Sequence, residues 1–182
     1  MLGERLRTLA AASIAGVVTG LVCGVLARLA MRLIVVVRGE AAEFTLTGSA
    51  GIVMTFIAMA CALGVGFALL SSGYRRGPRA SWWTLAGLFL LAVSLFLTPL
   101  RQEVARGPAF IVLFVPIGLF LGWGPAVLGS LLSKRLSTPT GGLASAGYMI
   151  LSIPGLISVV AMPLLIVFGI LQLVGMIPVP SS

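Results

Sequence analysis

Residues 8–27 carry no charged side chain over twenty consecutive positions: TLAAASIAGVVTGLVCGVLA. As an α-helix, a run of this length rises about 30 Å, which matches the hydrocarbon thickness of a bilayer. The residues before it, MLGERLR, resemble the charged start of a secretory signal, but the run is longer than the apolar part of such signals. We therefore expect a retained membrane span over about residues 8–27, with an extension to residue 37.

The composition of the whole chain matches this first run. Of its 182 residues, 59% are hydrophobic and only 9% are charged, and the mean hydropathy is +1.19. A soluble protein of this size needs many polar side chains to cover its surface, whereas lipid tails accept apolar ones. The sequence predicts an all-α fold, a polytopic transmembrane helical bundle that forms one domain over residues 1–182.

Four further apolar runs follow, at residues 51–73, 81–100, 109–133 and 146–177. Together with the first they predict about five spans. A polar stretch precedes the second run, in which Thr47 or Ser49 is a candidate for the N-cap of the helix. Trp82 and Trp83 open the third run next to a basic loop, as is typical of the membrane interface.

Prolines and glycines interrupt the last two runs. The fourth contains Pro116 and the sequence GWGP at 122–125, and the fifth contains Pro154 and Pro163. Because a proline inside a helix removes an amide donor, we expect both helices to be kinked. The fifth run is longer than one straight span requires, so part of it can lie along the interface.

The cations predict the orientation. Basic residues of membrane proteins concentrate in cytoplasmic loops, and a cytoplasmic N-terminus places seven of them inside: Arg5, Arg7, Arg75, Arg76, Arg79, Lys134 and Arg135. Three then lie outside together with the remaining carboxylates: Arg38, Arg101 and Arg106 with Glu40, Glu43 and Glu103. Because the net charge of +8 is divided among short clusters between apolar runs, we expect lipid headgroups of the cell membrane as partners and no nucleic acid.

Arg28 and Arg32 are the most unusual residues, because they follow a full-length span and precede another apolar stretch. One interpretation ends the first helix near Ala27 and turns both arginines towards lipid phosphates on the outer surface. A second pairs them with the outer glutamates. A third makes them an anion or lipid-headgroup site together with Arg101 or Arg106. Arg28 follows Gly24 by one helical turn, which favours partial burial.

Small residues at four-residue intervals predict where helices pack. Gly16, Gly20 and Gly24 form such a row in the first helix, and Ala58, Ala62 and Gly66 form another in the second. Ala60 and Gly64 lie beside the second row, and Gly118 and Gly122 repeat the pattern in the fourth helix. We expect the first two helices to pack on each other, while an interface between two copies of the chain remains the alternative.

Several residue types that carry chemistry are missing. The chain has no His and no Asp, and none of its glutamates lies inside an apolar run. Proton or sodium coupling, a catalytic triad and a metal site therefore lack their usual groups. Cys23 and Cys61 lack the spacing of a metal or redox motif, and they can meet only if their helices are neighbours. We expect no enzyme, no cofactor and no metal.

Three functional hypotheses follow from these patterns. The first is a non-enzymatic accessory or assembly subunit that packs against a larger membrane complex or against itself. The second is a carrier or channel for an anionic or lipid-like solute that uses Arg28 and Arg32 as its charged site. The third is a membrane enzyme that acts on lipids through the outer glutamates, for which no reaction can be assigned.

Overall fold

The computed structural model describes residues 2–37, 39, 45–70, 109–136 and 142–173. These residues form four α-helices and no strand: α1 (Leu2–Val37), α2 (Leu46–Leu70), α5 (Ala109–Arg135) and α6 (Gly142–Leu173). All four are long and apolar enough to cross a bilayer. The chain is thus a bundle of apolar helices, as expected of an integral membrane protein. The predicted third span, residues 81–100, lies outside the described residues.

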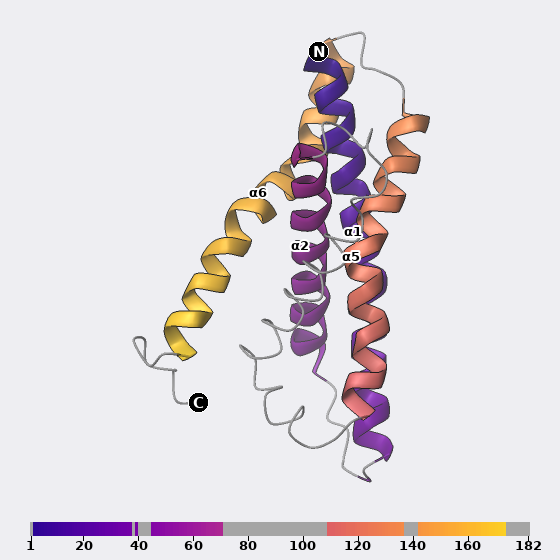
Figure 1. Ribbon diagram of the computed structural model, residues 1–182, viewed down its shortest axis with the longest axis vertical. Coiled ribbons are helices and arrows are strands. Elements are labelled where there is room, and N and C mark those ends of the chain that lie inside the picture. The colour runs from indigo at the N-terminus through magenta and orange to yellow at the C-terminus, as the bar shows by residue number, and fades with distance from the viewer. Residues whose placement is uncertain (1, 38, 40–44, 71–108, 137–141, 174–182) are drawn as a thin grey trace.

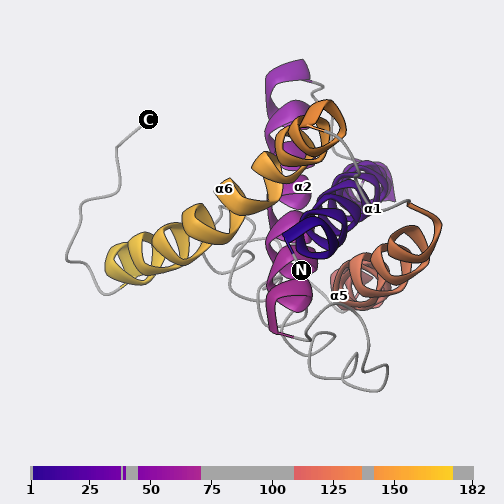
Figure 2. The ribbon, with the colours of Figure 1, turned by 90° about the horizontal axis from the view of Figure 1, so that it is seen from above.

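The bundle is built around α1, which contacts each of the other three helices. As Figure 1 shows, α1 and α6 run away from the end of the bundle that holds the N-terminus, while α2 and α5 run towards it. Within the described residues, α5 and α6 do not contact each other. Figure 2 shows them on different sides of α1, with α6 passing close to α2 and then moving away from it.

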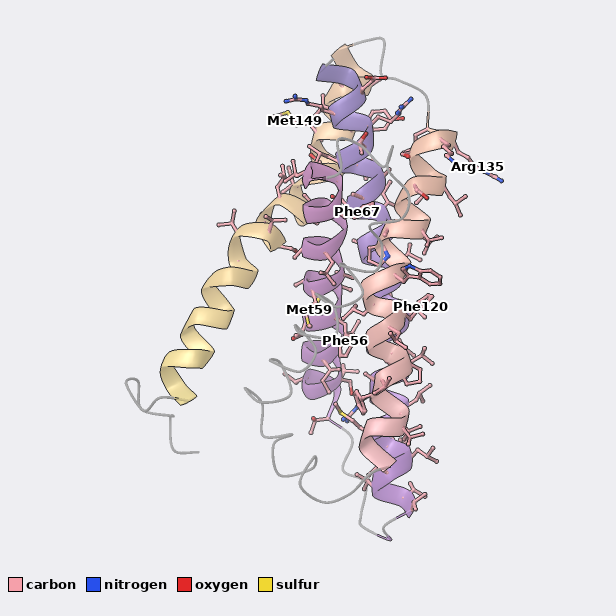
Figure 3. The ribbon with its side chains drawn as sticks, in the orientation of Figure 1. Phe56, Met59, Phe67, Phe120, Arg135 and Met149 are labelled. Carbon is pink, nitrogen blue, oxygen red and sulfur yellow. The ribbon has the colours of Figure 1, made fainter. Side chains whose placement is uncertain are left out.

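Two clusters of buried residues hold the helices together. The larger joins α1, α2 and α5 in the half of the bundle away from the N-terminus, and consists of Cys23, Ala27, Ala30, Ile34, Phe56, Met59, Ala60, Leu63, Phe114, Ile117 and Leu121. The smaller joins α1, α2 and α6 near the N-terminus and consists of Ala12, Val65 and Ala68, with Leu9 and Val159 packed against it. Phe56 and Met59, the α2 members of the larger cluster that are labelled, can be followed in Figure 3.

The interpretation that ends the first helix near Ala27 is wrong, because α1 is one helix from Leu2 to Val37. No proline or glycine occurs between Gly24 and Arg38 to interrupt it. At its end the amide of Gly39 donates to the carbonyl oxygen of Val36 at 3.0 Å, and Gly39 has a φ of 70°. Glycine adopts this left-handed conformation without the strain of a side chain, so it ends the helix here.

The start of α2 also differs from the prediction. Both the amide and the hydroxyl of Ser49 donate to the carbonyl oxygen of Thr45, at 3.1 and 3.0 Å. The helix therefore begins at Leu46, which gives Thr45 the N-cap position and includes Thr47 and Ser49 in the first turn. Hydropathy alone does not detect this first turn, because it contains polar residues, and hydropathy finds only apolar runs.

The two C-terminal helices continue through their prolines. α5 includes Pro116 and Pro125 and ends at Arg135, close to the predicted boundary of 133. α6 includes Pro154 and Pro163 and starts at Gly142, before the predicted 146. Ser158, four residues after Pro154, donates from its hydroxyl to the Pro154 carbonyl oxygen at 2.7 Å.

Candidate functional site

The candidate site predicted at Arg28 and Arg32 lies on α1, in the half of the bundle away from the N-terminus. Arg28 is partly buried and Arg32 is exposed, and each makes at least one interaction within the molecule. At a separation of four residues they share one side of the helix. Arg101 and Arg106, the other predicted members, lie outside the described residues.

The packing of α1 on α2 gives the depth of the two arginines. The contacts Gly16 with Cys61, Gly20 with Ile57 and Gly24 with Val53 follow one antiparallel register. If the same register is continued, Arg28 is level with Ser49 and Arg32 is level with Thr45, where α2 begins. The arginines therefore lie level with the start of α2 at one end of the bundle, with Arg28 one turn further inside.

The glycine row on α1 lies directly against the backbone of α2. A Cβ atom added at Gly16 would lie 2.5 Å from the Cα of Cys61, and one added at Gly24 would lie 2.7 Å from the Cα of Val53. A Cβ at Gly20 would collide with the backbone of Ile57. Without side chains at these positions the two backbones touch, and α2 of the same chain covers the whole row.

The partner row on α2 is not the one with the smallest residues. The atoms nearest to the three glycines belong to Cys61, Ile57 and Val53, and not to Ala58, Ala62 or Gly66. Ala58, Ala62 and Gly66 are partly buried, and the two alanines pack beside the larger buried cluster. One row of glycines is enough for close approach, because a backbone next to a glycine needs no small side chain of its own.

Gly64 and Gly124 mark the point where three helices cross. A Cβ at Gly64 of α2 would lie 2.9 Å from the carbonyl oxygen of Ala12 and 3.2 Å from the Cβ of Pro125. A Cβ at Gly124 of α5 would lie 2.6 Å from the Cγ2 and 3.0 Å from the Oγ1 of Thr19. The hydroxyl of Thr19 is buried there without a hydrogen-bond partner. Thr19 was not predicted as a site residue, since a threonine in an apolar run gives no sign of which helix it faces.

A polar contact between Ser13 and Ser152 holds α6 against α1. The hydroxyl of Ser13 lies 3.4 Å from the carbonyl oxygen of Ser152, at donor distance. The neighbouring Gly155 is buried against Ser13 and Val65, where an added Cβ would collide with both. This contact was also missed. The only sign of it in the sequence was Ser152 followed by Gly155 on the same side of α6, and serines and glycines are frequent throughout the chain.

The two cysteines contact other helices and not each other. The thiol of Cys23 lies 3.8 Å from the carbonyl oxygen of Ile117 in α5, and that of Cys61 lies 3.7 Å from the carbonyl oxygen of Ser13 in α1. Both are buried and free. Because Cys61 is level with Gly16, Cys23 is displaced from it by seven residues, or about 10 Å along the helix axis. This distance excludes a disulfide.

The described residues thus include a closely packed interior and a pair of arginines at one end of the bundle. They contain no group of three His, Cys, Asp or Glu side chains that could hold a metal ion. Comparison of the chain with models of protein families, with characterised proteins and with solved structures gives no match.

Proposed function

We propose that the chain is a non-enzymatic, multi-pass protein of the cell membrane that serves as an accessory or assembly subunit, with α6 packed against a transmembrane helix of a larger membrane complex. The small buried share of α6 carries the proposal. Only 17% of the most apolar window of α6 is buried within the bundle, against 50 to 56% for the other three helices. Over residues 142–161, α6 therefore has most of its surface free for an external partner.

The composition of the exposed side of α6 favours protein over lipid as its neighbour. Ala144, Ala146 and Gly147 are exposed, and nothing lies within 4 Å of the position of a Cβ at Gly147. Small residues allow another backbone to approach, whereas lipid chains gain nothing from them. Large apolar side chains continue the surface beyond them: Met149, Ile150, Leu151, Ile153, Leu156, Ile157 and Val160.

The residues available for chemistry support a role without catalysis. The four carboxylates of the chain are Glu4, Glu40, Glu43 and Glu103, all outside the uncharged runs. The buried polar side chains of the described helices are hydroxyls and thiols, and several bond to a carbonyl of their own or a neighbouring helix. Such groups hold helices together but lack a base that would activate them.

Five spans with a cytoplasmic N-terminus complete the proposal. α2 ends at the end of the bundle that holds the start of α1, whereas α5 begins at the opposite end (Figure 1). A chain that leaves at one end and returns at the other crosses the hydrocarbon an odd number of times in between. The uncharged run 81–100 has the length for one crossing.

The described cations support the orientation. Arg5 and Arg7 belong to the start of α1, and Lys134 and Arg135 belong to the end of α5. These two helix ends lie at the same end of the bundle (Figure 1). Basic clusters mark the cytoplasmic side. Bends in α5 and α6 belong to the same proposal: α6 moves away from α2 towards its C-terminal end (Figure 1), as a bend at Pro154 would produce.

Photo-crosslinking in intact cells tests the function. A photoreactive amino acid at Ile157 of α6, which is 61% exposed, should attach a single integral membrane protein in stoichiometric yield. The same group at Leu29 of α1, which is 57% exposed, is the matched control and should attach mainly lipid. Lipid adducts alone from Ile157, Ile150 and Val160 would contradict the proposal.

The partial burial of Arg28 favours one second candidate, a carrier or channel for an anionic or lipid-like solute. A guanidinium one turn inside the start of α2 can offer an anion several donors at reduced contact with water. Replacement of both Arg28 and Arg32 by Gln should then abolish binding of the solute. Retained binding in a folded double variant would remove this candidate.

A further inference from the structure

We propose that the end of the bundle formed by the start of α1 and the end of α5 binds the phosphate of an anionic lipid headgroup, and that Arg7 is the residue that holds it. This inference concerns a site different from Arg28 and Arg32. It is independent of the partner proposed for α6, because it involves neither that helix surface nor a second protein.

The described part of this end is strongly basic. Arg5, Lys134 and Arg135 are exposed and Arg7 is partly buried, while Glu4 is the one carboxylate among the described residues there. Helix dipoles do not explain or oppose this charge, because two helices begin at this end (α1 and α6) and two finish (α2 and α5). The local potential is therefore set by four cations against one anion.

Arg7 differs from the other three cations in its surroundings. Its Nε atom is buried and has no hydrogen-bond partner, although the side chain as a whole is only partly buried. Packing has thus removed water from one donor of the guanidinium without supplying an acceptor. The buried Nε cannot itself be reached from outside, so an external acceptor would bind the terminal nitrogens and offset the cost of a partly desolvated, unpaired charge.

Phosphate is the acceptor that fits this arrangement. A planar guanidinium presents paired donors that match phosphate oxygens, and a charged acceptor gains more from them than a neutral one. Arg7 stands immediately before the uncharged run 8–27, which places it at headgroup depth when that run spans the hydrocarbon. Anionic lipids enrich the same layer with phosphates, and neighbouring cations within a Debye length attract them.

Native mass spectrometry of the full-length protein in mild detergent tests the proposal. The probes are phosphatidylglycerol, phosphatidylcholine with the same acyl chains, and inorganic phosphate. The wild type should retain phosphatidylglycerol in preference to phosphatidylcholine and should not bind inorganic phosphate measurably. R7Q should weaken phosphatidylglycerol binding by roughly tenfold or more, the effect of losing one charge-assisted contact.

Two variants separate a site from a general effect of charge. K134Q removes one positive charge from the same end without touching Arg7, and it should change phosphatidylglycerol affinity by less than about threefold. R7K keeps the charge but not the paired donors, and it should bind more weakly than wild type and more tightly than R7Q. R7Q should keep the melting temperature of the wild type in phosphatidylcholine, because no protein acceptor is lost.

Three results would overturn the proposal. Equal loss of affinity in R7Q and K134Q would mean that the lipid responds to the charge of this end and not to Arg7. Unchanged phosphatidylglycerol binding in R7Q would remove the site. Binding of inorganic phosphate with the same dependence on Arg7 would make a free anion, and not a lipid, the ligand.

Discussion

Gly20 of α1 lies directly against the backbone of Ile57 of α2, with the carbonyl oxygen of Phe56 only 2.6 Å from the position that a Cβ of residue 20 would take. Two helices can approach this closely only where one of them lacks side chains. Gly16 and Gly24 make the same kind of contact one turn away on either side. The three glycine contacts together fix the register of the α1–α2 interface.

Replacement of Gly20 by Ala should therefore destabilise the protein. The added methyl group meets backbone atoms that cannot move independently, and overpacking of this kind costs about 1–3 kcal/mol. Gly147→Ala is the matched control, since it also adds a methyl group within a helix but meets nothing within 4 Å. The control should be neutral or slightly stabilising. Melting temperatures in mild detergent compare the two, and equal shifts would count against the backbone contact.

The unpaired hydroxyl of Thr19 makes a prediction of the opposite sign. Thr19→Val keeps the shape of the side chain beside Gly124 and removes a buried polar group that has no partner. We expect stabilisation of roughly 1 kcal/mol, at the low end of the cost of burying such a group.

Ser13→Ala should lower stability by about 0.5–1 kcal/mol, because it loses the contact with the Ser152 carbonyl. Equilibrium unfolding in mixed micelles measures both, and a destabilised Thr19→Val would mean that its hydroxyl has an acceptor after all.

The cysteines should stay reduced when the folded protein is treated with an oxidant. Their thiols face the carbonyl oxygens of Ile117 and Ser13, and the register keeps them about 10 Å apart along the axis. Both should react with a thiol reagent only after denaturation, because they are buried. Mass spectrometry of the alkylated protein checks this. An intramolecular disulfide in the folded protein would require a different arrangement of α1 and α2.

The sequence predicted the all-helical class and helices long and apolar enough to cross a bilayer, because both follow from the length of uncharged runs. The run after Ala27 already contained no helix breaker before Gly39, so a single long α1 was within reach of the same reasoning. Hydropathy could not locate the start of α2, since Thr47 and Ser49 are polar residues that lie within a helix.

Which residues face one another was less predictable. The glycine row of α1 was visible in the sequence, but its contacts with Val53, Ile57 and Cys61 depend on how α2 is rotated. That rotation is set by the larger buried residues of α2, of which Phe56, Met59 and Leu63 join the cluster with α1 and α5. The sequence gives no measure of such packing. Thr19 and Gly155 were missed for the same reason.

The arrangement of helix ends makes the last prediction, which concerns the number of spans. α2 ends at Leu70 and α5 begins at Ala109 at opposite ends of the bundle (Figure 1), so residues shortly after 70 and shortly before 109 should be accessible from opposite sides of the membrane. We expect Ser72→Cys and Leu136→Cys to react only with a reagent that enters the cytoplasm, and Thr45→Cys and Gly107→Cys with an impermeant reagent outside. The native thiols need not be removed if they are unreactive in the folded protein. Labelling of Ser72→Cys and Gly107→Cys from the same side would exclude an odd number of crossings between α2 and α5, and with it the five-span bundle.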